Sequence, residues 1–158
     1  MRKETIEFRK LSKDEFSSYQ KVMLEDYAQD IARNFNRPID EVRVEAKKQV
    51  KEILNRGLST KGHFLYNVLK RKTGEAVGFV WFKVDETKKS AFLYGILIHE
   101  TYRGKGYGKK TMKLLETKLR RMGITQLGLH VFASNQVAIN LYKSQGFFTA
   151  SFNMQKDL

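Results

Sequence analysis

The sequence predicts one α/β domain of the α+β type over residues 1–158, with a mixed, mostly antiparallel central sheet of six to seven strands and about four flanking helices. Two observations predict this class. Between residues 63 and 98, three segments rich in Val, Phe and Tyr are separated by short polar turns, which is typical of an antiparallel meander. On both sides of this region apolar residues recur every three or four positions, which predicts amphipathic helices that cover the sheet.

The N-terminal part of the chain predicts a strand followed by a long helix. Residues 5–11 alternate apolar and charged side chains, as a half-buried strand does. Ser12 and Glu15 have the spacing of a capping box, so we expect a helix to begin there and to end near Asn34. A break in this helix near residues 25–29 is an alternative.

A second helix is expected before residue 57, and strands follow it. Gly57 stands where a helix C-cap is expected. The apolar side of this helix consists of Val42, Ala46, Val50, Ile53 and Leu54. The predicted strands of the meander are residues 63–70, 76–85 and 91–98.

The C-terminal third predicts two more helices with strands after them. Apolar residues at helical spacing predict a helix over residues 108–122, and the next strand is expected at residues 125–132. Asn135 is a good N-cap for a helix that ends near Gln145. Residues 147–154 are expected to form one or two final strands.

Composition limits the classes of function. The chain has 30 Lys and Arg against 17 Asp and Glu, a net charge of +13, which favours a polyphosphate cofactor, nucleic acid or an acidic protein as partner. The basic residues alternate with acidic ones along the chain, so a solvated surface is favoured over nucleic-acid binding. The absence of Cys excludes a Cys nucleophile and a thiolate metal site, and no metal is expected. Without a long apolar run, we expect a cytoplasmic protein that does not enter the membrane.

The stretch RGKGYGKKT, residues 103–111, lies between a predicted strand and a predicted helix. Such a glycine-rich turn gathers backbone N–H groups at a helix N-terminus, where they bind phosphate. The spacing of a P-loop would need Gly at Arg103 and Ser or Thr at Lys110, and a dinucleotide fingerprint would need Gly at Lys109 or Thr111. Both motifs are therefore excluded.

Two motifs resemble the GNAT superfamily of acyl-CoA-dependent N-acetyltransferases. Arg103, Gly106 and Gly108 fit the superfamily's cofactor loop, in which Arg or Gln is followed by Gly and then Gly or Ala at fixed spacing. The second motif, NQVAINLYKSQGF, begins at Asn135 and includes Tyr142. The resemblance covers roughly residues 77–148 and implies acetyl-CoA as co-substrate.

The resemblance implies which groups hold the cofactor. Backbone groups of the fourth strand would bind the pantetheine arm, and the loop amides would bind the pyrophosphate. The implied cofactor-binding residues are Ile96, Leu97, Ile98, Arg103, Gly104, Lys105, Gly106, Tyr107, Gly108, Lys109, Asn135 and Tyr142. Asn135 is also expected to cap its helix.

The resemblance also implies catalytic groups for direct transfer of the acetyl group to an amine. The amide of Ile96 would stabilise the oxyanion, and Tyr142 would protonate the departing thiolate, although it could instead pack its helix on the sheet. His130 could accept the proton of the amine, but an ordinary strand histidine and a water-mediated route are alternatives. Phe92 stands where another subgroup has its catalytic glutamate.

The acceptor is expected to contact Glu25 and Tyr27 on the first helix, and Tyr94, which strand alternation places on the same side as Ile96. These side chains could equally be ordinary helix surface and core. The acceptor is expected to be a primary amine of a small molecule, a peptide or a protein, and the enzyme a monomer or a homodimer. A non-catalytic acyl-CoA-binding module or a basic RNA-associated module is the alternative function.

Overall fold

The computed structural model describes residues 4–158. One five-stranded sheet has the strand order β1-β2-β3-β4-β5. Its strands are β1 (Ile6–Lys10), β2 (His63–Lys70), β3 (Ala76–Asp85), β4 (Ser90–Ile98) and β5 (Gln126–Leu129). The helices are α1 (Lys13–Phe35), α2 (Ile39–Ile53), α3 (Tyr107–Arg121) and α4 (Gln136–Ser144), with short 3₁₀ turns η1 (Gly57–Ser59) and η2 (Glu100–Tyr102). Strands β1 to β4 pair antiparallel and β5 pairs parallel to β4, so the mixed, mostly antiparallel sheet is confirmed.

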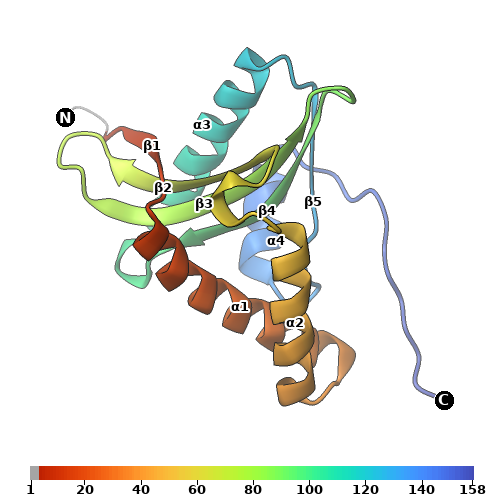
Figure 1. Cartoon of the computed structure of the whole chain (residues 1–158). Coiled ribbons are helices and arrows are strands. Elements are labelled where there is room, and N and C mark those ends of the chain that lie inside the picture. Colours follow the sequence, from red (N-terminus) through yellow and green to blue (C-terminus); the bar gives the residue numbers. More distant parts are fainter. Residues whose placement is uncertain (1–3) are drawn as a thin grey trace.

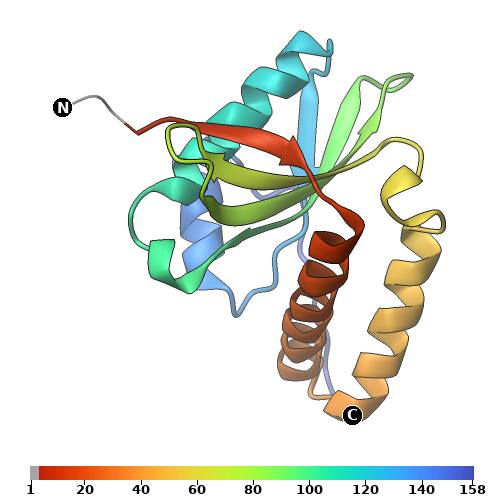
Figure 2. The same ribbon diagram turned by 60° about the vertical axis from the view of Figure 1, so that its left-hand side comes forward.

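The helices cover the two faces of the sheet in pairs (Figure 1). Helices α1 and α2 lie on one face, and α3 and α4 lie on the other, as the turned view in Figure 2 shows. The α3 face holds the larger apolar core, which includes Phe82, Leu93, Met112 and Leu115. This arrangement follows from the amphipathic pattern of the helices, whose apolar sides are buried against the strands.

The long first helix begins as the sequence predicts. Ser12 accepts a hydrogen bond from the backbone N–H of Glu15, and the Glu15 carboxylate accepts one from the N–H of Ser12. The capping box is therefore confirmed, while the helix continues to Phe35 without the break considered near residues 25–29. Helix α2 has its C-cap at Leu54, so the expectation that Gly57 caps it is wrong; Gly57 instead opens η1.

The expected strands at residues 147–154 are absent, and the sheet has five strands rather than six to seven. The alternation of this segment is real, but a strand forms only where its backbone groups find partners, and here they pair with no strand of the described chain. In Figure 1 the C-terminal segment leaves α4 without joining the sheet, and Gln155 within it lines a cavity beside α1. None of the helices in residues 4–158 combines the length and the apolar character needed to cross a membrane.

Candidate active site

The two central strands of the site separate after a short parallel pairing. Strand β5 ends at Leu129, which lies opposite Leu93, while β4 continues to Ile98. The register between β3 and β4 also shifts here, because Trp81 lies opposite Gly95 and Phe82 lies opposite Leu93. Tyr94 is thus the extra residue of a β-bulge, and bulges bend a strand and disturb its pairing. Within residues 4–158, the second half of β4 consequently has no strand partner on this side, which leaves it a free edge.

The free edge of β4 presents the backbone groups of Ile96 and Ile98. The N–H of His99 donates to the carbonyl of Val77 at 2.9 Å, and hydrogen-bonded pairs alternate along an antiparallel ladder. The N–H and C=O groups of Ile98 and Ile96 therefore point away from β3, toward the side that β5 has left. The Nε of Arg103 confirms this direction, since it donates to the carbonyl oxygen of Ile98 at 2.9 Å.

The glycine-rich loop after β4 forms the N-terminus of α3. Gly104 and Gly106 have φ of 70° and 83°, in the left-handed region that favours glycine. Gly106 is the N-cap, so no side chain occupies the helix N-terminus, and Lys110 is the first residue whose N–H bonds back to it. Within the described chain the amides of residues 107–109 have no acceptor. They form a concave donor set of the kind that binds phosphate.

Basic side chains surround this loop. Lys105 donates to the carbonyl of Thr101 at 2.9 Å, and Lys110 lies 5.1 Å from the centre of the Tyr107 ring. The Tyr107 side chain itself is buried, and its hydroxyl donates to Glu4 at 2.6 Å. Tyr107 can therefore offer a ligand only its backbone, whereas Arg103 and Lys109 are exposed at the loop.

Tyr142 on α4 lies on the α3 side of the sheet. Its half-buried ring packs against the same apolar cluster as Ile96 and lies 5.6 Å from the ring of Phe147. Burial raises the pKa of Tyr142, so its hydroxyl stays protonated and able to donate at neutral pH. At the start of the same helix, Asn135 accepts a hydrogen bond from the N–H of Ala138 at 3.1 Å, so the predicted cap is confirmed.

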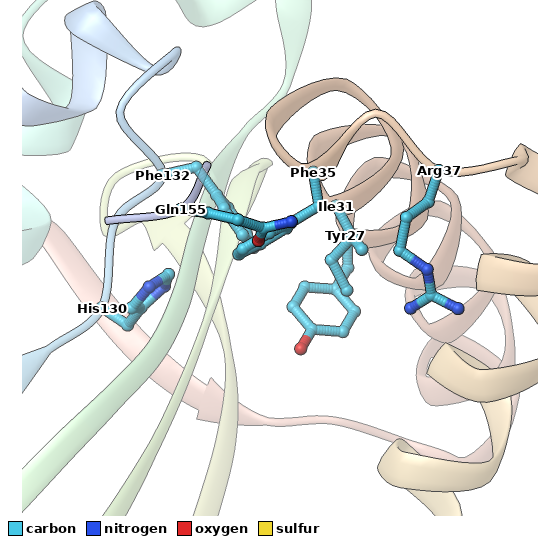
Figure 3. Close-up of a pocket in the computed structure, with 7 residues that line it drawn as sticks. All are labelled: Tyr27, Ile31, Phe35, Arg37, His130, Phe132 and Gln155. Atoms are coloured by element: carbon cyan, nitrogen blue, oxygen red, sulfur yellow. The ribbon is translucent and has the colours of Figure 1, made fainter. Parts of the chain in front are cut away.

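His130 lies on the opposite side of the sheet, directly after the last paired residue of β5. Its ring meets that of Phe132 edge-on with 4.8 Å between the ring centres. Both side chains line a cavity of about 430 Å³ between the end of β5 and α1 (Figure 3). The cavity is lined by Tyr27, Ile31, Phe35, Arg37, His130, Phe132 and Gln155.

Contacts between residues far apart in sequence join α1 to α2 and to the segment after β5 beside the cavity. The amide of Asn34 donates to the hydroxyl of Ser134 at 2.8 Å and accepts from the Ser134 N–H at 3.3 Å. Tyr27 lies 6.0 Å from Phe132 between ring centres and donates its hydroxyl to Gln49 at 3.2 Å. Of the acceptor residues expected from the sequence, Tyr27 alone lines this cavity.

The Glu25 carboxylate is bound by side chains of α1 and α2 outside the cavity. Its carboxylate accepts two hydrogen bonds from Arg43 of α2, at 2.8 and 3.0 Å, and one from Gln29. These bonds lower the pKa of Glu25 to about 2. Arg37 likewise donates to both carboxylate oxygens of Glu45, so the one Arg among the lining residues given for the cavity is already paired.

The expectation that Tyr94 faces the same side as Ile96 is wrong. Tyr94 stacks on Trp81 with 4.3 Å between ring centres, on the α1 face, whereas Ile96 packs on the α3 face. The bulge at Tyr94 adds a residue and breaks the alternation on which the expectation rested. Trp81 in turn donates its Nε1–H to Nδ1 of His63 at 3.0 Å, and burial lowers the pKa of His63.

Sequence reasoning did not find most of the cavity. The lining residues that it missed are Ile31, Phe35, Arg37, Phe132 and Gln155. Ile31 and Phe35 lie one helical turn apart on α1 and repeat the spacing from Tyr27. The spacing of Tyr27, Ile31 and Phe35 was the one local sequence signal for the cavity. The same spacing also occurs on helix faces that are packed in a core.

A glycine-rich helix N-terminus beside a free strand edge suits a ligand that has phosphates and an extended arm. Comparison with known proteins gives the family. The model of the Acetyltransferase (GNAT) family matches residues 16–147. The chain therefore belongs to the GNAT family, as the two motifs predicted, and is an acetyltransferase whose co-substrate is acetyl-CoA.

Two proteins of Bacillus subtilis are similar over nearly the whole chain. The N-acetyltransferase YycN is 34% identical over 156 residues, which cover 98% of this chain and 99% of YycN. YdgE is 25% identical over 150 residues, with 94% and 95% covered. The crystal structure of YycN superposes with a TM-score of 0.91 at 33% identity, covering 98% of this chain and 99% of that one.

A more distant structure supports the fold. The PaiA N-acetyltransferase of Thermoplasma acidophilum, solved in complex with coenzyme A, has a TM-score of 0.69 at 21% identity. The match covers 94% of this chain and 93% of the PaiA chain.

Proposed function

We propose that this enzyme transfers the acetyl group of acetyl-CoA directly to the primary amine of a small molecule with an apolar or aromatic body. The observation that supports this most strongly is the free edge of β4 directly beside the unpaired amides of the glycine loop. An extended arm with amide groups can pair with such an edge while its phosphates bind at the loop. We assign the arm to the backbone of residues 96–98 and the pyrophosphate to residues 103–109.

In the proposed mechanism, acetyl-CoA supplies a thioester that a neutral amine attacks. The N–H of Ile96 points to the free edge and would donate to the carbonyl oxygen as it gains negative charge. Tyr142 would protonate the departing sulfur from the α3 side, and its raised pKa keeps that proton available. His130 would accept the amine's proton from the α1 side, directly or through water.

The cavity beside His130 is proposed as the acceptor site. A volume of about 430 Å³ suits a small molecule, and Tyr27, Ile31, Phe35 and Phe132 give it apolar and aromatic walls. None of its lining residues is a carboxylate, and Arg37 is paired with Glu45. A polyamine would lose the hydration of its cationic groups without gaining an anionic partner there, so an amine with one charge and an apolar body is favoured.

Release of coenzyme A thiol from acetyl-CoA, measured across a panel of amines, tests the proposal. The panel pairs phenethylamine with putrescine and adds a peptide that begins with alanine. The peptide is included because 61 residues of this chain are 38% identical to the ribosomal protein bS18-alanine N-acetyltransferase of Escherichia coli, covering 41% of that protein. We expect phenethylamine to be acetylated with the highest kcat/KM.

A variant links the turnover to the cavity. Phe132→Ala should raise the KM for phenethylamine about tenfold, because the ring forms one wall of the cavity, and should leave the Kd of acetyl-CoA unchanged. Val44→Ala, which alters an exposed apolar residue of α2, is the matched control. If putrescine is the best acceptor, the assignment of substrate class is refuted. If acetyl-CoA raises the Tm while no amine is acetylated, the non-catalytic binding module replaces the enzyme mechanism.

A further inference from the structure

A groove lies between the edge strand β1 and the C-terminal half of α3, and in Figure 2 β1 crosses in front of this helix. Its volume is about 430 Å³, and its lining residues are Glu7, Phe8, Arg71, Leu114, Thr117, Lys118, Arg121 and Met122. Phe8 of β1 and Leu114 and Met122 of α3 are half-buried and pack on the larger core. The groove therefore has apolar walls, and it lies at the other end of α3 from the glycine loop.

The outer edge of β1 has free backbone groups beside the groove. The N–H of Leu11 donates to the carbonyl of Leu65 at 3.2 Å, and hydrogen-bonded pairs alternate along an antiparallel ladder. The N–H and C=O groups of Ile6, Phe8 and Lys10 therefore point away from β2. Strand β1 ends the strand order, so within residues 4–158 no strand pairs with this side. An open edge of this kind is a template for an added strand.

Helix α3 brings an excess of positive charge to the groove. It contains six Lys and Arg residues against one acidic residue, Glu116, whose carboxylate is paired with Arg120 at 3.2 Å. The first two of these bases, Lys109 and Lys110, lie at the glycine loop. The others lie further along the helix, so binding of a cofactor at the loop leaves their charge unused.

Two bases that line the groove are without an acidic partner. Among the residues that the structure describes, no carboxylate lies within salt-bridge distance of Lys118 or Arg121. The third base of the lining, Arg71, lies 3.4 Å from Glu7 and compensates the charge of that carboxylate. The groove therefore combines a free strand edge, apolar walls and a net positive charge.

We propose that this groove binds an extended acidic segment of a partner protein, which adds as an antiparallel strand to the outer edge of β1. A residue opposite Phe8 would have its side chain on the same face as the Phe8 ring, over the apolar walls. Residues two positions before and after it face the same way, and one of them lies opposite Lys10. The favoured segment has one apolar residue with Asp or Glu two positions away on either side.

Charge and chemistry disfavour two other occupants. Pairing of the β1 edges of two copies would bring together Arg9 and Lys10 of both chains, and basic residues on an edge strand suppress such pairing. A nucleic acid would place phosphates over Phe8, Leu114 and Met122, whose side chains offer no hydrogen bond. An acidic peptide satisfies the backbone edge, the apolar walls and the bases together.

Fluorescence anisotropy with the labelled peptide Thr-Glu-Thr-Leu-Thr-Glu-Thr tests the proposal. We expect saturable binding that weakens about tenfold or more when both Glu are replaced by Gln, or Leu by Ser. Methylation of the Leu amide nitrogen should abolish binding, because this N–H faces β1, whereas methylation of the next Thr amide should be tolerated. Equal losses from the two methylations, or no saturable binding up to about 1 mM peptide, refute strand addition.

Variants of the protein locate the peptide. Lys118→Gln/Arg121→Gln should weaken peptide binding about tenfold, because both bases line the groove. The control Lys51→Gln/Lys143→Gln makes the same change in charge at exposed residues of α2 and α4 and should bind normally. Both variants should keep the Kd of acetyl-CoA, and circular dichroism checks that they are folded. Equal binding by the two double variants refutes the location.

The other occupants have their own measurements. If an oligouridylate displaces the peptide and binds more tightly, the surface is a nucleic-acid site and the proposal is overturned. Light scattering coupled to size exclusion gives the oligomeric state with and without peptide. A dimer that the peptide dissociates would show that a second copy occupies the edge of β1, which also overturns the proposal.

Discussion

The glycine loop makes a quantitative prediction at Gly106. This residue is the N-cap of α3 with φ of 83° and ψ of 7°, and a Cβ added to it would meet no atom within 4 Å. The cost of Gly106→Val is therefore backbone strain and not collision. A left-handed conformation costs an L-residue roughly 1–2 kcal/mol, and a β-branched one is worse. For a domain of this size, that corresponds to a Tm lower by about 2–8 °C.

The larger expected effect of Gly106→Val is on the cofactor. Relief of the strain rotates the peptide units that hold the amides of residues 107–109 together. Loss of one hydrogen bond to a charged phosphate costs about 1.5–3 kcal/mol, which is roughly a 10- to 150-fold weaker Kd for coenzyme A. Isothermal titration with coenzyme A measures this change, and a thermal melt measures the strain.

A second glycine provides the control. Gly74, in the turn between β2 and β3, also has a positive φ, 73°, and open space at the Cβ position. Gly74→Val should lower the Tm by a similar amount and leave the Kd of coenzyme A unchanged. Gly106→Asn should lose less stability than Gly106→Val, because Asn tolerates the left-handed region. A Gly106→Val enzyme that binds coenzyme A as tightly as the unsubstituted protein would show that the loop does not hold the phosphates.

Two further predictions concern a proton donor and an ion pair. Tyr142→Phe should lower kcat about 100-fold with little change in the Kd of acetyl-CoA. Tyr66→Phe, which removes the hydroxyl of a buried ring elsewhere, should leave kcat unchanged. If Tyr142→Phe is as active as the unsubstituted enzyme, Tyr142 is not the general acid. Glu25 has its pKa lowered to about 2, chiefly by Arg43, so its contribution to stability is complete above its ordinary value of 4.5 and is lost as the pH falls toward 2. Arg43→Gln should flatten the Tm between pH 4.5 and 2, and an unchanged profile would refute the coupling.

Features specified by neighbouring residues were predicted well. The capping box of Ser12 and Glu15 and the cap at Asn135 depend on residues three apart, and both are present. The loop at residues 103–108 could be recognised because the turn itself requires its glycines at fixed positions in the sequence. By contrast, the segment at residues 147–154 has a strand's alternation, but strand formation depends on a partner edge that the sequence pattern does not specify.

The bulge in β4 shows a second limit. Alternation predicted that Tyr94 and Ile96 share a face, and one inserted residue put them on opposite faces. The same bulge lies where β5 ends, so it changes the direction of the side chains at the place where the strand edge becomes free. Gly95 follows Tyr94 directly, and an isolated Gly inside a strand pattern is a signal of a bulge that the alternation argument overlooked. The error therefore falls at the proposed site itself, where a departure from regular geometry gives the strand its free amides.

The donor and acceptor sides of the site differ in how far they can be predicted, and the reason is sequence separation. The proposed donor side consists mainly of one strand and the loop after it, so most of it, apart from Tyr142 of α4, lies in a single stretch of the chain. The proposed acceptor cavity joins α1 to the residues after β5, with Asn34 bonded to Ser134 a hundred positions later. The motifs therefore define the acetyl donor, and under the proposed function the side chains that line the cavity would determine which amine enters it.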